Sequence, residues 1–146
     1  MNTNSYIGDF EIIAIGFEPG EMLLESIREV IKKHDIVNGA VISGIGTLKN
    51  ANLHHIEHTN FPPDNHFFNI EKPLELVSVN GLIANGEPHL HVALTCGENE
   101  AFGGHLEDGS EVLYLAEIEI MKHNGLKMKR VYDEKRQISL MKGLEE

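Results

Sequence analysis

The spacing of hydrophobic residues predicts one helix near the start of the chain, preceded by a strand. Over residues 21–34, hydrophobic side chains recur every three to four positions, as they do on one face of an amphipathic helix. Acidic residues fall in the first turn of this segment and Lys32-Lys33-His34 in the last, where each sign of charge complements the helix dipole. Pro19-Gly20 separates the helix from residues 9–18, whose β-branched and aromatic residues predict a strand.

The rest of the chain alternates between apolar runs and short polar breaks, which is typical of strands. Asn85-Gly86 and Asn124-Gly125 are favoured in two-residue hairpin turns, because both central positions of such turns need a positive φ. Gly44-Ile45-Gly46 is expected to turn the chain. We expect strands over 40–43, 74–84, 89–96, 112–121 and 126–132, a hairpin or long strand over 48–58, an exposed loop over 59–65, and a final turn or arm over 138–144.

Strands that follow one another through short turns, with one long helix near the start, predict an α+β domain with a largely antiparallel sheet. The 146 residues make up one domain's worth of chain, and about 68% of the surface of such a chain can be buried. We expect one domain over 9–142 with short tails at 1–8 and 143–146. A single cysteine, Cys96, excludes an intrachain disulfide, and its place in the alternation puts it on the core side. The sequence shows neither a membrane span nor a signal peptide, which favours the cytoplasm.

The charge of the chain is unevenly distributed. The net charge is −11, and the bases are concentrated after residue 121. An acidic protein repels the phosphate backbone of DNA unless its bases are gathered in one place. The basic stretch 127–136 could therefore contact nucleic acid, protect an edge strand from aggregation, or interact with the acidic body or a neighbouring subunit. Its bases are Lys127, Lys129, Arg130, Lys135 and Arg136.

Three of the nine histidines have the spacing of metal ligands. On a strand, His89 and His91 share one face about 6–7 Å apart, while Leu90 faces the core. Two imidazoles so placed can each bring a nitrogen to about 2.0–2.1 Å from one ion. His105 follows Gly103-Gly104, whose missing side chains permit tight turning and close approach, and it could complete a three-histidine site with an open fourth position. The spacing alone also fits two solvated histidines on a polar strand face.

Four motifs between residues 76 and 120 make a more specific pattern than the histidine pair. They are Gly81-Leu82-Ile83-Ala84, Pro88-His89-Leu90-His91, Gly103-Gly104-His105-Leu106 and Ala116-Glu117-Ile118-Glu119-Ile120. Together they resemble the PPC (plants and prokaryotes conserved) domain, and the resemblance extends upstream to Glu18-Pro19-Gly20-Glu21 and Ser43-Gly44-Ile45-Gly46. It implies a fold like that of acetolactate decarboxylase, a homotrimer, and one zinc ion on His89, His91 and His105.

The resemblance leaves two classes of function open. In plants the same domain follows AT-hooks in nuclear DNA-binding proteins, and these plant domains generally lack the histidines. This chain has the histidines and lacks the Arg-Gly-Arg core of an AT-hook. One hypothesis is a zinc-dependent enzyme with lyase- or decarboxylase-like chemistry on a small anionic metabolite. The alternative is a DNA-binding or protein-assembly module. A third histidine ligand favours the enzyme hypothesis, because a binding module does not need an open metal position. We expect DNA binding to be weak or absent.

Other polar residues near these motifs have competing interpretations. Glu117 could orient a ligand histidine or act as a general base to metal-bound water, or it could be an ordinary sheet-face or interface glutamate. His54 and His58 would share a strand face roughly 13 Å apart, too far for one ion. We therefore expect His54, His55 and His58 to be exposed or at an interface, and Glu107, Asp108 and Glu111 to be solvated turn residues.

Overall fold

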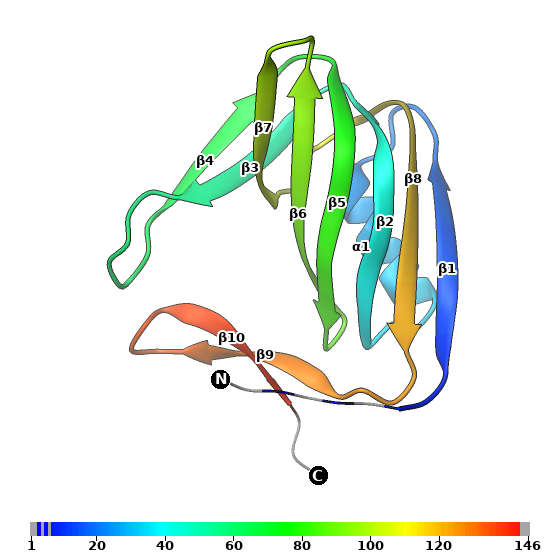
Figure 1. Cartoon of the computed structure of the whole chain (residues 1–146), viewed down its shortest axis with the longest axis vertical. Helices are drawn as coiled ribbons and strands as arrows, with labels where there is room; N and C mark the ends of the chain where they lie inside the picture. Colours follow the sequence, from blue (N-terminus) through cyan, green and yellow to red (C-terminus); the bar gives the residue numbers. More distant parts are fainter. Residues whose placement is uncertain (1–2, 4, 6, 144–146) are drawn as a thin grey trace.

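The protein is built on one eight-stranded antiparallel sheet, with strand order β1-β8-β2-β5-β6-β7-β3-β4. The computed structural model describes residues 3, 5 and 7–143. The α+β class with a largely antiparallel sheet is confirmed (Figure 1). In chain order the elements are β1 (Phe10–Phe17), α1 (Leu23–Lys33), β2 (Asn38–Leu48), β3 (Ala51–Ile56), β4 (Asn65–Ile70), β5 (Leu74–Ala84), β6 (Glu87–Cys96), β7 (Glu100–Leu106), β8 (Val112–His123), β9 (Met128–Asp133) and β10 (Ile138–Gly143).

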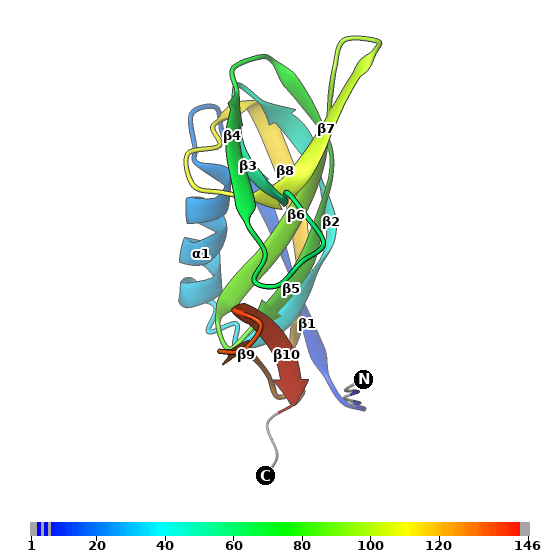
Figure 2. The ribbon, with the colours of Figure 1, turned by 90° about the vertical axis from the view of Figure 1, so that its left-hand side faces the viewer.

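Helix α1 covers one face of the sheet and leaves the other face open, as Figure 2 shows from the side. Its apolar stripe, including Ile27, is buried in the same core cluster as alternate strand residues such as Leu90 and Leu94 of β6. Each fully buried side chain of this size contributes about 1.5–3 kcal/mol. The predicted core side of β6 is confirmed, and Cys96 packs against the core from the same side. The open face consequently carries the residues between them, including His89 and His91.

The turn predicted at Gly44-Ile45-Gly46 is wrong, because these residues lie inside the continuous strand β2. The strand shifts register against β8 between Val41 and Ser43 and again between Gly46 and Leu48. Glycine serves close approach here: a Cβ added at Gly46 would lie 2.5 Å from the carbonyl oxygen of Leu115. The same glycine pattern that suggested a turn instead allows β8 to pack tightly against β2.

The hairpin predicted at Asn124-Gly125 is also wrong. Strand β8 pairs with β1 on one side and β2 on the other, whereas β9 pairs with β10 in a separate two-stranded sheet. The buried side chain of Asn38 accepts a hydrogen bond from the backbone N–H of Met128 at 3.2 Å, which anchors the start of β9 to the main sheet. At Asn85-Gly86 the tight turn is confirmed, with φ of 55° and 80°.

The remaining predictions have mixed outcomes. The final arm is a strand, β10, and residue 144 at its predicted end lies outside the described residues, as does most of the two predicted tails. Segment 48–58 contains the single strand β3, and its partner β4 has no counterpart among the predicted strands. No helix in the described part of the chain is long and apolar enough to span a bilayer.

Gly103-Gly104 does not turn the chain, because both residues lie within β7. The close approach predicted for them is confirmed. A Cβ added at Gly103 would lie 2.9 Å from the carbonyl oxygen of Val92 on β6, and one added at Gly104 would lie 2.7 Å from that of His54 on β3. These glycines allow β7 to fit between its two neighbours.

We expect Gly104→Ala to lower the free energy of unfolding by about 1–3 kcal/mol, because the added methyl group must push the backbone of β3 away. Urea denaturation would measure the loss. Gly16→Ala in β1 is the matched control, since a Cβ added there meets nothing within 4 Å. Equal losses in the two variants would contradict the close packing of β7 against β3.

Candidate metal centre

Four histidines from three neighbouring strands meet on the open face of the sheet. His91 of β6 lies directly opposite His105 of β7, and His105 lies directly opposite His54 of β3. His89 precedes His91 by two residues, so it shares that face. The row depends on strand register, because a slip of one residue would turn a histidine to the other face.

The three histidines singled out from the sequence are brought together by the structure. The ring centroids are 5.2 Å apart for His89 and His91, 5.1 Å for His89 and His105, and 5.4 Å for His91 and His105. Imidazoles that share one tetrahedral ion through nitrogens at about 2.0–2.1 Å would have centroids roughly 5.2 Å apart. The ring centres of the three histidines thus have the spacing of imidazoles grouped around one ion.

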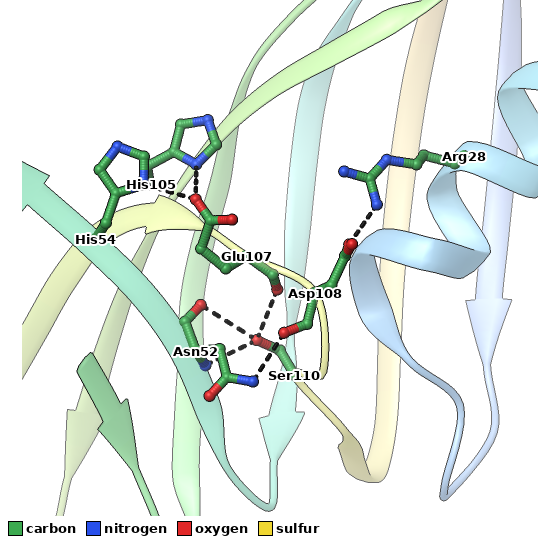
Figure 3. A network of polar contacts seen from close by, with 7 residues as sticks. All are labelled: Arg28, Asn52, His54, His105, Glu107, Asp108 and Ser110. Atoms are coloured by element: carbon green, nitrogen blue, oxygen red, sulfur yellow. Dashed lines mark hydrogen bonds and ion pairs between the residues drawn. The ribbon is translucent and has the colours of Figure 1, made fainter. Parts of the chain in front are cut away.

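His54 and Glu107 extend the cluster, and Figure 3 shows the carboxylate of Glu107 reaching both the His54 and the His105 ring. The Glu107 Oε1 atom lies 2.6 Å from His54 Nδ1 and 3.0 Å from His105 Nδ1. The two rings stack with centroids 4.5 Å apart. A carboxylate can only accept, so each Nδ1 carries the proton and each neutral ring has its lone pair on Nε2. Glu107 thus orients the nitrogen of His105 that is free to bind a metal.

The expectations for His54 and Glu107 are corrected by these contacts. Their side chains are only 19% and 32% exposed, so His54 is not an exposed histidine and Glu107 is not a solvated turn residue. The pairing of β3 with β7 brings them together across more than fifty residues of chain. His55 is exposed as expected. Asp108 and Glu111 form ion pairs at the surface, with Arg28 and Lys49 respectively.

The loop that carries Glu107 is held firmly against β3 (Figure 3). The Glu107 backbone N–H donates to the carbonyl of Asn52 at 2.9 Å, and the Asn52 side chain donates to the carbonyl of Asp108 at 2.7 Å. Ser110 is fully buried, and its hydroxyl accepts from the Asn52 N–H at 3.0 Å. Because these hydrogen bonds fix the loop backbone, the carboxylate of Glu107 is held in a defined position although Glu107 lies in a loop.

Among the described residues, the group whose ligand atoms all lie within 4.8 Å of one another is a different one, His54, His105 and Glu107. Two donor sets therefore share His105. The hydrogen bonds already explain the spacing of this second group, and an ion there would have to displace the protons that Glu107 accepts. The first set leaves those hydrogen bonds intact.

Glu117 does not join the histidines. Strands β2 and β5 lie between β8, which carries Glu117, and β6, a separation of about 14 Å at the usual strand spacing. Its side chain is exposed, and its backbone neighbours are Gly16 and Ile45. Within one chain Glu117 therefore cannot contact the clustered histidines, and the carboxylate that does so is Glu107.

The histidines line a pocket of about 670 Å³ between the main sheet and the β9–β10 hairpin. Arg130, Tyr132 and Ser139 of the hairpin line the same pocket. In the sequence Arg130 is one of the bases of the stretch 127–136, and nothing there assigns it to the site. No local signal could have placed it here, because its position depends on how the hairpin packs beside the main sheet.

His89, His91 and His105 favour the neutral form, which is the form that binds metals. Burial, followed by the charge of Arg130, lowers the pKa of His89 to about 4. Burial is also the main cause that lowers the pKa of His91 and His105, and in both cases the nearby His54 adds to it. Glu107 opposes part of the lowering of the His105 pKa. Near neutral pH these imidazoles therefore have lone pairs available.

The family model for the Plants and Prokaryotes Conserved (PCC) domain, also written PPC, matches residues 4–124. The chain belongs to this family. The matched residues include all four histidines of the cluster and Glu107, but they end before the β9–β10 hairpin.

Solved structures share this fold. A plant- and prokaryote-conserved (PPC) protein from Pyrococcus horikoshii is 28% identical, with a TM-score of 0.77 and coverage of 97% of this chain and 99% of its own. A metal-containing protein from Archaeoglobus fulgidus is 23% identical, with a TM-score of 0.79 and coverage of 99% and 100%. A protein from Bacteroides thetaiotaomicron, provisionally named DNA-binding, is 18% identical, with a TM-score of 0.75 and coverage of 98% of both chains. At these identities the last two show a common fold alone.

Curated relatives include the bifunctional protein GlmU of Synechococcus sp. (strain JA-3-3Ab), which is 24% identical over 111 residues. The match covers 76% of this chain but 17% of that protein, so the chain spans less than a fifth of the curated relative's length.

Proposed function

We propose that the protein binds one zinc ion through His89, His91 and His105 and acts as a metal-dependent enzyme on a small anionic metabolite. The observation that carries the proposal is the mutual spacing of the three rings, 5.1–5.4 Å between centroids. The metal-containing protein that shares the fold supports it. The ion would leave one position open toward the pocket, as catalytic zinc sites do.

In this proposal Glu107 orients a metal ligand, and Arg130 binds the anionic metabolite. Bound zinc would act as a Lewis acid that polarises a carbonyl or carboxylate, which suits lyase- or decarboxylase-like chemistry. Glu107 holds the proton on Nδ1 of His105 and thereby keeps its Nε2 directed to the site. Arg130 supplies a positive charge in the same pocket, where an anionic metabolite would bind.

Purified protein should carry about one zinc or other borderline divalent ion per chain, the class of metal that imidazoles favour. His91→Ala should remove most of the metal without unfolding the chain, because a core of this size does not need the ion. Glu107→Gln should weaken binding by about 10- to 100-fold. Metal content is measured by mass spectrometry after dialysis, with circular dichroism to check folding.

His66→Ala is the matched control for the metal measurement, because His66 lies on β4 with a half-exposed side chain beside Glu57. Full occupancy in His91→Ala would overturn the proposed ligand set. Loss of metal in His54→Ala together with full retention in His91→Ala would instead place the ion between His54, His105 and Glu107.

We further propose that the protein is a homotrimer assembled through the open face of the sheet. Ile45, Val77 and Leu115 lie on the neighbouring strands β2, β5 and β8, and each is about half exposed. An apolar patch in the middle of a sheet is typical of a subunit interface.

Light scattering should give a trimer at low micromolar concentration. Ile45→Lys should dissociate the trimer, whereas Phe61→Lys, in an exposed loop, should not. A monomeric wild-type protein would reject this assembly.

The alternative function, DNA binding, is favoured by the provisional name of one fold relative. The structure reduces the charge available for it, because Arg136 pairs with Asp133 at 2.7 Å and Arg130 lines the histidine pocket. We therefore predict at most weak, sequence-independent binding of duplex DNA at physiological salt, with a steep loss as salt rises. Fluorescence anisotropy would measure it. Nanomolar, sequence-selective binding that persists in His91→Ala would replace the enzyme proposal by the DNA-binding one.

A further inference from the structure

Arg130 of β9 lies beside the histidines, although the hairpin that carries it is outside the residues matched by the family model. The hydrogen bond from Met128 to Asn38 anchors the first residue of β9 to the main sheet. Arg130 lines the histidine pocket, and its charge is the second cause that lowers the pKa of His89. The hairpin thus adds a cation to a site whose other parts come from the domain itself.

The guanidinium of Arg130 has donors to spare. It donates one hydrogen bond across the hairpin to the carbonyl of Ser139 at 3.1 Å, and a guanidinium has five N–H groups. None of the ion pairs in the described part of the chain involves Arg130. On the same hairpin, Arg136 by contrast is neutralised by Asp133. Arg130 is therefore free to bind a carboxylate in the two-point geometry that arginine favours.

A second cavity of about 210 Å³ adjoins the histidine pocket. His89, Arg130 and Ser139 line both spaces, so the two lie next to each other at these side chains. The other residues of the second cavity are aliphatic: Leu82, Ala84, Leu140 and Met141. An alkyl chain of a few carbons would be stabilised there by burial of its apolar surface.

We propose that this combined pocket binds a short-chain aliphatic monocarboxylate. Its carboxylate pairs with Arg130 next to the histidines, and its alkyl chain extends along Leu82, Leu140 and Met141. A single negative charge suits the site, because Glu87 also lines the histidine pocket and would oppose a more highly charged ligand. The inference rests on the proposed function, since it assigns the chemical class of the small anion that the metal centre would act on.

The test is a titration of zinc-loaded and of metal-free protein with acetate, butyrate and hexanoate, followed by isothermal calorimetry and by backbone amide shifts. Affinity should rise about fourfold for each added methylene that enters the aliphatic cavity. Hexanamide, which has the same tail and no charge, should bind far more weakly. Leu140→Ala should weaken the binding of hexanoate but not that of acetate.

Arg130→Gln should weaken hexanoate binding by about tenfold to a hundredfold, the range expected for a lost charge-assisted pair. Arg136→Gln on the same hairpin is the matched control and should bind as the wild type does. Arg130→Lys retains the charge without the planar fork and should fall between the two. Backbone amide shifts of the Arg130→Lys variant that match those of the wild type would show that the hairpin still folds when Arg130 is replaced.

The outcomes separate this inference from the proposed metal function. If the protein holds no metal yet hexanoate binding still depends on Arg130, the metal function fails and the carboxylate site stands. If Arg130→Gln binds hexanoate like the wild type, if hexanamide binds equally well, or if no carboxylate binds, the inference is overturned. The zinc content of His91→Ala then still decides the metal site independently.

Discussion

The register that joins β6, β7 and β3 is the constraint on which the site depends. Leu53 of β3 lies opposite Leu106 of β7, and both are buried at 1% and 0% exposure. Because side chains alternate along each strand, burial of this leucine pair forces the adjacent pair, His54 and His105, onto the open face. The hydrophobic effect thus positions the histidines: any slip that broke up their row would also expose leucines from the core.

The local parts of this arrangement were predictable from the sequence, and the non-local parts were not. Alternation within one strand was enough to place His89 and His91 on one face and Leu90 on the other. The pairing of β3 with β7 leaves no local pattern, so neither His54 nor Glu107 could be assigned to the site. Asn124-Gly125 fails as a hairpin for a related reason: β8 already has β1 and β2 on its two edges, so β9 has no edge to pair with.

Glu107 and Glu117 show why local surroundings mislead in the choice of a functional carboxylate. Glu117 lies between core residues of a strand, which left a functional role open beside that of an ordinary sheet-face glutamate, whereas Glu107 lies in a polar turn, which suggested solvation. In the structure Glu107, not Glu117, lies beside the histidines, because the turn backbone is tied to Asn52 and the buried Ser110. A turn becomes a precise support when its polar backbone groups are paired with buried partners, and that pairing depends on the tertiary fold.

The distribution of charge makes the two proposals, binding of a small anion and weak binding of DNA, compatible with each other. The net charge of −11 repels a polyanion over its whole length. A small ligand inside the pocket is closer to Arg130 than to most surface carboxylates, whose influence is screened over about 8–10 Å at physiological salt. His89, His91 and His105 favour the neutral form because burial lowers their pKa values. The metal that they are proposed to hold would add positive charge at the same place. If the proposed carboxylate site is present, it would therefore select by the size of the anion as well as by its sign: Arg130 can pair with one carboxylate inside the pocket, whereas the net charge of −11 opposes a chain of phosphates at the surface.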